Sequence, residues 1–345
     1  MSTLDRIERI CGRDLDDRAL RIALLAEIRA EVAADAYAWL LTDPETCVGA
    51  SPLAETPSLD DLPTLIRLKY LTPANRWTAL RSGSAATLVD ATGGDRSASP
   101  VWDGLLSGYG VDDVLSTVFR DRHGCWGFLD LWRRGGTFTR RERDLVGRLG
   151  GAVTAGLRGS LAATFARPAD RLDAGAGPVV LLLGDDLRLL IQTPATDAYL
   201  RDLLPTAADR APVPAAAYNV AAQLLAREQG VDAHPPSVRV HLRDGVWVTL
   251  RAARVVGTPP APGASIAVSL APTPPAERAA LYARVAGLSA REGELLRHLV
   301  AGCDTRELAR RLHVSEHTVQ DHLKSVFDKT GARNRRTLLA RINGR

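Results

Sequence analysis

Hydrophobic side chains recur at helical spacing in four successive stretches between residues 286 and 345. The third stretch begins after Ser315, a typical helix N-cap residue, and ends at Gly331, a typical C-cap residue. Its apolar positions i, i+4, i+7 and i+8 lie on one helical face and are Val319, Leu323, Val326 and Phe327. The pattern therefore predicts an all-α bundle of four short helices.

Residues 1–167 mix helical and strand-like patterns. Apolar side chains recur at helical spacing over residues 20–28, and residues 125–132 alternate in the manner of a strand. A long helix is predicted after Thr139, because Thr139 and Glu142 form a capping-box pattern. We therefore expect an α+β domain.

Residues 178–271 show a second mixture, in which strand patterns flank an Ala-rich helix. Stretches rich in Pro, Gly and Ala precede and follow it, at residues 166–178 and 272–285. The prediction is thus a multidomain chain, with two α+β domains, a linker over 272–285 and an all-α domain over 286–345.

The excess of positive charge lies entirely in the last domain. Residues 286–345 hold twelve Arg and Lys against seven Asp and Glu, a net charge of +5, whereas the whole chain has a net charge of +4. A local excess of this kind is typical of a surface that binds a polyanion, although a solvated basic tail would look the same.

Polar side chains occupy the face opposite the apolar stripe of the third helix. They are His317, Gln320, Asp321, Lys324 and Asp328. A short helix, a tight turn and a second helix with a polar outer face form the helix-turn-helix arrangement, whose second helix enters the major groove of DNA.

These residues carry a resemblance to a known family. The chain resembles the LuxR-type four-helix DNA-binding domain over L-S-A-R-E-G-E-L-L-R-H-L-V-A-G-C-D-T-R-E-L-A-R-R-L-H-V-S-E-H-T-V-Q-D-H-L-K-S-V-F-D-K-T-G-A-R-N-R-R. The resemblance implies base contacts by Gln320, Asp321 and Lys324. It implies DNA backbone contacts by Thr305, Ser315, His317, Thr318, Arg333, Asn334, Arg335 and Arg336. It also implies that the fourth helix is the contact of a homodimer.

Asp321 is an unusual residue for a surface that meets phosphates. A carboxylate in the major groove can accept a hydrogen bond from cytosine N4, while Gln320 suits adenine and Lys324 suits guanine. The alternative is that Asp321 pairs with Lys324 and acts only by repelling wrong sequences. The sequence leaves both interpretations open.

The front of the chain resembles sensor domains. Residues 1–167 resemble a GAF domain on A-T-G-G-D, R-H-G-C-W-G-F-L-D-L-W-R and T-F-T-R-R-E, and residues 178–271 resemble a PAS domain. Such folds imply ligand sensing or dimerisation. A candidate ligand pocket is formed by Tyr37, Trp39, Trp126 and Phe128, with Trp126, Phe128 and Trp132 predicted on one face of a strand. The same aromatic side chains are also typical of a packed core.

Other function classes find little support. The chain has no G-x-S-x-G or H-E-x-x-H motif, and none of its lysines follows a glycine as a P-loop requires, so we expect no enzyme and no cofactor. Asp185 and Asp186 imitate the acidic pair of a receiver domain, but residues 178–280 contain no lysine, so a turn between strands is predicted. The four scattered cysteines predict no metal site and no disulfide.

The sequence predicts a cytoplasmic transcriptional regulator with no membrane segment and a charged N-terminus unlike a signal peptide. Its partners would be double-stranded DNA, a second copy of the chain and an unknown small molecule. The alternative is a constitutive dimer whose GAF-like and PAS-like domains serve only dimerisation or protein interaction.

Overall fold

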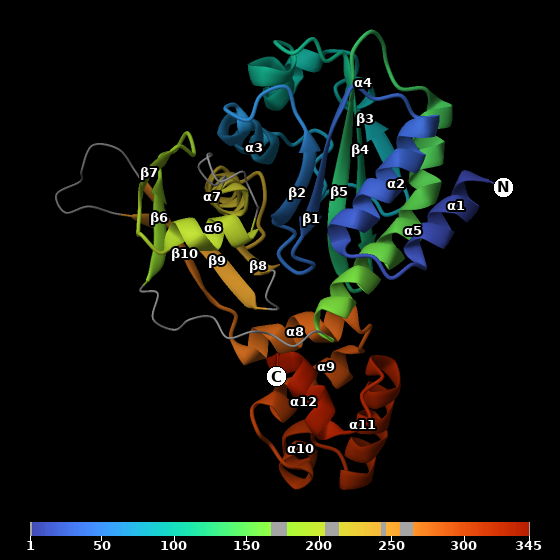
Figure 1. Cartoon of the computed structure of the whole chain (residues 1–345), viewed down its shortest axis with the longest axis vertical. Coiled ribbons are helices and arrows are strands. Elements are labelled where there is room, and N and C mark those ends of the chain that lie inside the picture. Colours follow the sequence, from blue (N-terminus) through green and yellow to red (C-terminus); the bar gives the residue numbers. More distant parts are fainter. Residues whose placement is uncertain (1, 167–177, 204–213, 243–245, 256–264, 345) are drawn as a thin grey trace.

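Two antiparallel sheets and a C-terminal group of helices make up the protein in the computed structural model (Figure 1). The structure describes residues 2–166, 178–203, 214–242, 246–255 and 265–344. The predicted linker at 166–178 lies almost wholly outside these residues. Within them, no helix combines the length and the apolar character needed to cross a bilayer.

The first sheet has the strand order β2-β1-β5-β4-β3. Its strands are β1 (Ala36–Thr42), β2 (Gly49–Glu55), β3 (Ala85–Thr87), β4 (Asp113–Asp121) and β5 (Gly124–Arg133). One face is covered by α1 (Thr3–Cys11), α2 (Asp17–Glu31) and α5 (Arg140–Thr164). The other face carries α3 (Leu62–Leu71), α4 (Leu88–Ala91) and the short turns η1 (Arg96–Ala98) and η2 (Trp102–Leu106). The predicted capping box at Thr139 is confirmed at the start of α5.

The second sheet has the strand order β7-β6-β10-β9-β8. Its strands are β6 (Val179–Leu183), β7 (Leu189–Gln192), β8 (Ser237–His241), β9 (Trp247–Val255) and β10 (Ser265–Pro272), with α6 (Thr196–Leu203) after β7. β6 and β7 pair across a tight turn in which Asp186 Oδ1 accepts a hydrogen bond from Arg188 N at 3.0 Å. The predicted turn at Asp185 and Asp186 is thus confirmed.

Helix α7 (Ala215–Glu228) lies between the two sheets. It packs against α3 and β2 on one side and against β9 and β10 on the other. Residues are buried around most of its circumference, because six of its fourteen positions are alanines. A helix whose side chains are buried around most of its circumference is stable only inside a protein. α7 therefore joins the two α+β domains by packing.

Helix α8 (Pro275–Val285) replaces most of the linker predicted over 272–285, so that prediction is wrong. The prolines of this stretch stand before and in the first turn of the helix, where a missing N–H costs nothing. Its apolar side chains join a continuous core with α5 and with α9 (Ala290–Val300), α10 (Thr305–Leu312), α11 (Glu316–Thr330) and α12 (Arg335–Asn343). The four C-terminal helices match the prediction.

A buried ion pair lies where the two sheets and α8 meet. Arg239 on β8 donates to both carboxylate oxygens of Asp43, from Nε to Oδ2 and from Nη2 to Oδ1, each at 2.7 Å. Its Nη1 also donates to the Glu277 carbonyl on α8 at 3.1 Å, and its Nη2 to Glu45 Oε2 at 3.0 Å. The Asp43 side chain is only 1% exposed, and the pKa of its carboxyl, which burial alone would raise, is lowered by Arg239. One guanidinium thus holds three parts of the chain together.

Replacing Asp43 with Asn should lower the free energy of unfolding by about 3 kcal/mol, because Arg239 would keep its charge in a buried place without its buried carboxylate partner. Urea unfolding of the full chain measures this loss. Glu45→Gln is the matched control: Glu45 contacts the same guanidinium but its side chain is 47% exposed, so a loss below about 1 kcal/mol is expected. Equal losses for the two variants would contradict the role given to the Asp43 pair.

Candidate functional site

Helices α10 and α11 form a helix-turn-helix. α10 ends at His313, whose left-handed φ of 52° reverses the chain, and Ser315 caps α11 two residues later. α11 buries Val319, Leu323 and Val326 against the bundle. The polar residues on its other face are exposed, and they are His317, Gln320, Asp321, Lys324 and Asp328. The three predicted base-contacting side chains therefore lie together on one open helical face.

Asp321 makes only a loose contact with His317. Its Oδ2 lies 3.7 Å from Nε2 of His317, and the two side chains are 66% and 88% exposed. No ion pair joins Asp321 to Lys324 in the described part of the chain. The pairing with Lys324 considered above is thus not the geometry observed. The Asp321 carboxylate points toward solvent, where a partner molecule can reach it.

A buried carboxylate fixes the angle of α11. Glu292 on α9 is bound through both oxygens to Nζ of Lys329 at 2.7 Å, and Oε1 accepts from Ser325 Oγ at 2.7 Å. The Glu292 side chain is 5% exposed. Burial acts to raise the pKa of its carboxyl, but the bonds from Lys329 and Ser325 lower that pKa to about 2. Glu292 also completes the capping box of α9 with Ser289, and no local pattern in the sequence indicates its bonds to α11.

Seven of the eight predicted backbone-contacting residues fall into three groups. His317, Arg333 and Arg336 are exposed, and Thr305 and Thr318 are partly buried at the starts of α10 and α11. Ser315 and Asn334 are N-caps: Ser315 Oγ accepts from Thr318 N at 3.1 Å, and Asn334 Oδ1 accepts from Thr337 N at 2.9 Å. The caps set the N-terminal ends of α11 and α12, where the helix dipole favours an anion.

Arg335 is turned toward the protein. Its guanidinium donates to the carbonyl of Cys303, which lies in the loop before α10, and the side chain is partly buried. This contact ties α12 to the helix-turn-helix. Arg335 is therefore engaged in holding the bundle together, while the neighbouring Arg333 and Arg336 extend into solvent. Helix α12 itself packs against α8, with Leu338 and Ile342 buried.

Residues 286–341 match the family model described as bacterial regulatory proteins, luxR family. The C-terminal bundle is thus a LuxR-type DNA-binding domain, and the match agrees with the expectation of a regulator rather than an enzyme. No curated protein matches the chain. Among solved structures, the chain is similar to Escherichia coli SdiA, with 14% sequence identity and a TM-score of 0.33 over 99% of this chain and 95% of that chain.

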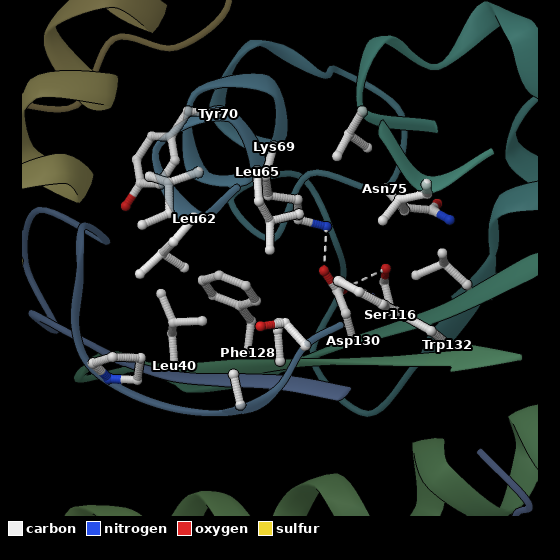
Figure 2. Close-up of a pocket in the computed structure, with 18 of the residues that line it drawn as sticks. Leu40, Leu62, Leu65, Lys69, Tyr70, Asn75, Ser116, Phe128, Asp130 and Trp132 are labelled. Carbon is white, nitrogen blue, oxygen red and sulfur yellow. Dashed lines mark hydrogen bonds and ion pairs between the residues drawn. The ribbon is translucent and has the colours of Figure 1, made fainter. Parts of the chain in front are cut away.

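A cavity of about 70 Å³ lies between the first sheet and α3. Figure 2 shows its apolar wall, to which β1 and β5 contribute Leu40, Phe128 and Trp132 and α3 contributes Leu62 and Leu65. This volume is several times the roughly 10–15 Å³ that one buried water needs.

One end of the cavity is polar. Lys69 Nζ lies 2.7 Å from Asp130 Oδ2, and Ser116 Oγ donates to Asp130 Oδ1 at 2.7 Å (Figure 2). Asp130 is only 5% exposed. The Lys69 ammonium also lies 5.8 Å from the centroid of the Phe128 ring, within the range of a cation–π contact. An otherwise apolar space therefore ends in one charge-neutral pair.

The four candidate pocket residues are divided between the two faces of the sheet. Phe128 lines the cavity, whereas Tyr37, Trp39 and Trp126 pack on the opposite face beneath the helices. The prediction that Trp126 shares a face with Phe128 and Trp132 is wrong. In the β4–β5 pairing, Phe119 faces Gly127 but Arg120 faces Cys125, so Trp126 is the extra residue of a bulge. A bulge reverses the alternation of side chains beyond it.

The cavity residues that sequence reasoning missed come from elements far apart in the chain. Lys69, Ser116 and Asp130 belong to α3, β4 and β5, and Asn219 belongs to α7 of the second domain. Asp130 carried a signal, since it is a carboxylate at an inward position of an apolar strand. The other residues had none, because their proximity depends on the tertiary fold.

Replacing Glu292 with Gln should lower the free energy of unfolding by about 2 kcal/mol near pH 7, because two charge-assisted bonds to Lys329 are lost. Since the folded-state pKa of Glu292 is about 2 and the ordinary value is 4.5, this contribution is complete above pH 4.5 and decreases as the pH falls toward 2. The difference between wild type and variant should therefore shrink below pH 4.5.

Denaturant unfolding of the full chain at several pH values measures this difference. The control is Glu294→Gln on the same helix, whose partly exposed pair with Arg291 predicts a loss below about 1 kcal/mol. A difference between wild type and Glu292→Gln that stays constant from pH 7 to pH 3 would refute the ionised Glu292–Lys329 bond.

Proposed function

We propose that the protein is a sequence-specific transcriptional regulator that acts as a homodimer on double-stranded DNA in the cytoplasm. The observation that carries this proposal is the exposed polar face of α11, on a helix-turn-helix that matches a family of regulatory proteins. The net charge of +5 over residues 286–345 supports it, because phosphate contacts supply most of the affinity of a DNA-binding protein.

The base-reading side chains in this proposal are Gln320, Asp321 and Lys324, which project from α11 into the major groove. Lys324 donates to guanine, Gln320 pairs with adenine, and Asp321 accepts from cytosine N4. The exposed position of Asp321 and its loose pairing with His317 favour base contact over an internal role. Arg333 and Arg336 hold the phosphates and offset the repulsion between Asp321 and the backbone.

A homodimer suits the geometry of DNA. Two copies on half-sites about one helical turn apart would each place α11 in the major groove. The resemblance assigns the contact to α12, whose inner face packs against α8 and whose outer residues include the exposed Arg336. In this proposal, α8 links the position of α12 to the state of the front domains.

The front domains act as the sensor in this proposal, with residues 1–167 GAF-like and residues 178–271 PAS-like. The cavity beside Lys69 and Asp130 supports a small-molecule ligand over a purely dimerising role, because its polar pair is enclosed by apolar walls as in ligand sites generally. A ligand regulates DNA binding only if it binds two states of the protein with different affinity.

Binding to a duplex of random sequence tests the DNA interface without knowledge of an operator. Each of Arg333→Ala and Arg336→Ala should reduce the slope of log affinity against log salt by about 0.9, because each variant loses one phosphate contact. Asp321→Asn should increase the affinity for this random duplex, since a charge that repels the phosphates is removed. Fluorescence anisotropy of the full chain across a salt series gives both quantities.

Arg140→Ala is the matched control, because Arg140 is 86% exposed on α5, in the first domain. It should leave the slope unchanged. If all three arginine variants behave alike, the basic residues of the C-terminal domain do not contact phosphate, and the helices of this domain serve a protein partner instead.

A further inference from the structure

An open cleft of about 520 Å³ lies between the first domain and the back of the DNA-binding domain. One wall is formed by the turn between β4 and β5 together with α5, and the other by the turn after α8 together with the end of α11. Its charged or titratable lining residues are Asp121, Arg122, His123, Arg158 and Lys329. The cleft is separate from the cavity beneath the first sheet.

Two contacts attach one wall of the cleft to the other. Arg284 on α8 donates from Nη1 to the His123 carbonyl at 2.9 Å. The His123 ring lies against Gly287, where a Cβ would be 3.5 Å from Nε2 and where the left-handed φ of 66° favours glycine. The turn between β4 and β5 is thus attached to the end of α8, beside the open part of the cleft.

The carboxylates of both walls are already bound by their neighbours. Asp121 Oδ2 accepts from Arg158 Nη1 at 2.7 Å, and Oδ1 accepts from His123 N at 2.8 Å and from Trp126 Nε1 at 3.0 Å. On the other wall, Glu292 is bound to Lys329 and Ser325 as described above. These carboxylates therefore have little capacity left to neutralise further positive charge.

The cations of the cleft, in contrast, keep unused donors. Arg122 is exposed, its Nε donates to His123 Nε2 at 3.0 Å, and no ion pair joins it to a carboxylate in the described part of the chain. Arg158 uses one of its five N–H groups for Asp121. Lys329 is 40% exposed and has three N–H groups for the two oxygens of its carboxylate partner. Three cationic side chains thus face one lining carboxylate, with free donors on both walls.

His123 lies within this excess of positive charge. Burial lowers the pKa of its imidazole, Asp121 acts in the opposite direction, and Arg158, Arg122 and Arg284 lower the pKa further. The ammonium at the end of α11 lines the same cleft. An anion bound here would offset the effect of the cations and would favour the protonated ring, which can donate to that anion.

We propose that this cleft binds the phosphate group of a small organic phosphate with a polar body, of the sugar phosphate class. A doubly charged oxyanion matches the excess of cations and accepts several charge-assisted hydrogen bonds at once. The cleft volume lies within the range of small-molecule sites, so it has room for more than the phosphate. The remaining lining residues, Ala286 and Gly287, are small, which suits a polar body rather than a large apolar one.

A small molecule suits the cleft better than the DNA backbone does. Lys329 follows Lys324 by five residues, which places it about 140° further around α11 at 3.6 residues per turn. The face of α11 that is proposed to read bases therefore points away from the cleft. A ligand that contacts Arg122 and Lys329 together would join the first domain to α11 without occupying the DNA-binding face.

Calorimetric titration of the full chain with glucose 6-phosphate, in the absence of DNA, tests the proposal. Glucose 6-phosphate should bind, whereas glucose should not, because glucose carries no charge for the cations of the cleft. Inorganic phosphate should bind about tenfold more weakly than glucose 6-phosphate, since it lacks the hydrogen bonds of the organic body.

Arg122→Ala should weaken the binding of glucose 6-phosphate by at least about tenfold, because a charge-assisted hydrogen bond to the phosphate is lost. Arg122 is exposed, so the fold should be retained. Arg140→Ala is the matched control, because Arg140 is 86% exposed on α5 and does not line the cleft. It should leave the affinity unchanged.

The titration of the His123 ring, followed by NMR and assigned with His123→Gln, gives an independent measurement. Saturating sulfate serves as the oxyanion, because its charge stays constant between pH 5 and pH 8 on the order of these experiments. Sulfate should raise the pKa of His123 by about 1 relative to chloride, since a bound anion favours the imidazolium.

Equal losses of affinity in Arg122→Ala and Arg140→Ala would overturn the site, because the ligand would then respond only to overall charge. Absence of binding by both phosphates, or a pKa of His123 that sulfate does not change, would overturn it as well. If inorganic phosphate binds as tightly as glucose 6-phosphate, the assignment to an organic phosphate is wrong.

DNA binding distinguishes this proposal from the proposed function. Arg122→Ala should leave the slope of log affinity for a random duplex against log salt unchanged. A slope reduced by about 0.9, the value expected for Arg333→Ala, would mean that the cleft holds a phosphate of DNA and that the small-molecule assignment is wrong. Failure of the cleft to bind any probe would leave the proposed DNA interface of α11 intact.

Discussion

The bidentate ion pair between Arg239 and Asp43 is the constraint on which the arrangement of the front of the molecule depends. Asp43 closes the β1–β2 hairpin of the first domain, Arg239 lies on the edge strand of the second sheet, and the same guanidinium reaches the first turn of α8. Two buried charges are favourable only when they are held in contact. The two domains and the helix that leaves them are therefore held together at this point, and Phe165 adds ring contacts with Trp247 of β9 and Tyr282 of α8.

The C-terminal domain uses its charges in a different way. Glu292 and Lys329 are bound to each other at the back of α11, and Arg335 is bound to the Cys303 carbonyl, so these side chains hold the bundle together. Gln320, Asp321 and Lys324 remain exposed at the front. The domain thus separates side chains that support the fold from side chains that are available to a partner. Since its apolar core continues through α8 into the first domain, a shift of helices in one domain can change the packing in the other.

The predictable part of the structure is the part that depends on neighbouring residues. The caps at Thr139 and Ser315 and the apolar stripe of α11 were visible in the sequence, because they involve residues three or four positions apart. Helix α8 was not predicted, because the prolines at its N-terminal end indicated a linker. The position of Trp126 could not be predicted, because a bulge is a property of strand pairing and one extra residue reverses the face of a side chain.

Of the cavity residues, the sequence pointed only to Phe128 and Trp132. The polar residues of the cavity wall come together because α3, two strands and α7 pack against one another. The ion pair of Asp43 with Arg239 likewise joins residues that are 196 positions apart in sequence. Contacts at such separations leave no periodic signal in a single chain. The predicted base-contacting residues, by contrast, share one helix, and their common exposure follows from helical geometry alone.

The most direct test of the central claim is selection of binding sites from a pool of random duplexes at about physiological salt, with the full-length protein and with Asp321→Ala in parallel. The account predicts a two-fold-symmetric motif, with half-sites about one helical turn apart, in which the variant loses the preference for one C·G pair in each half-site. Failure of the wild type to enrich any motif, or an identical motif for both proteins, would contradict sequence reading by the exposed face of α11.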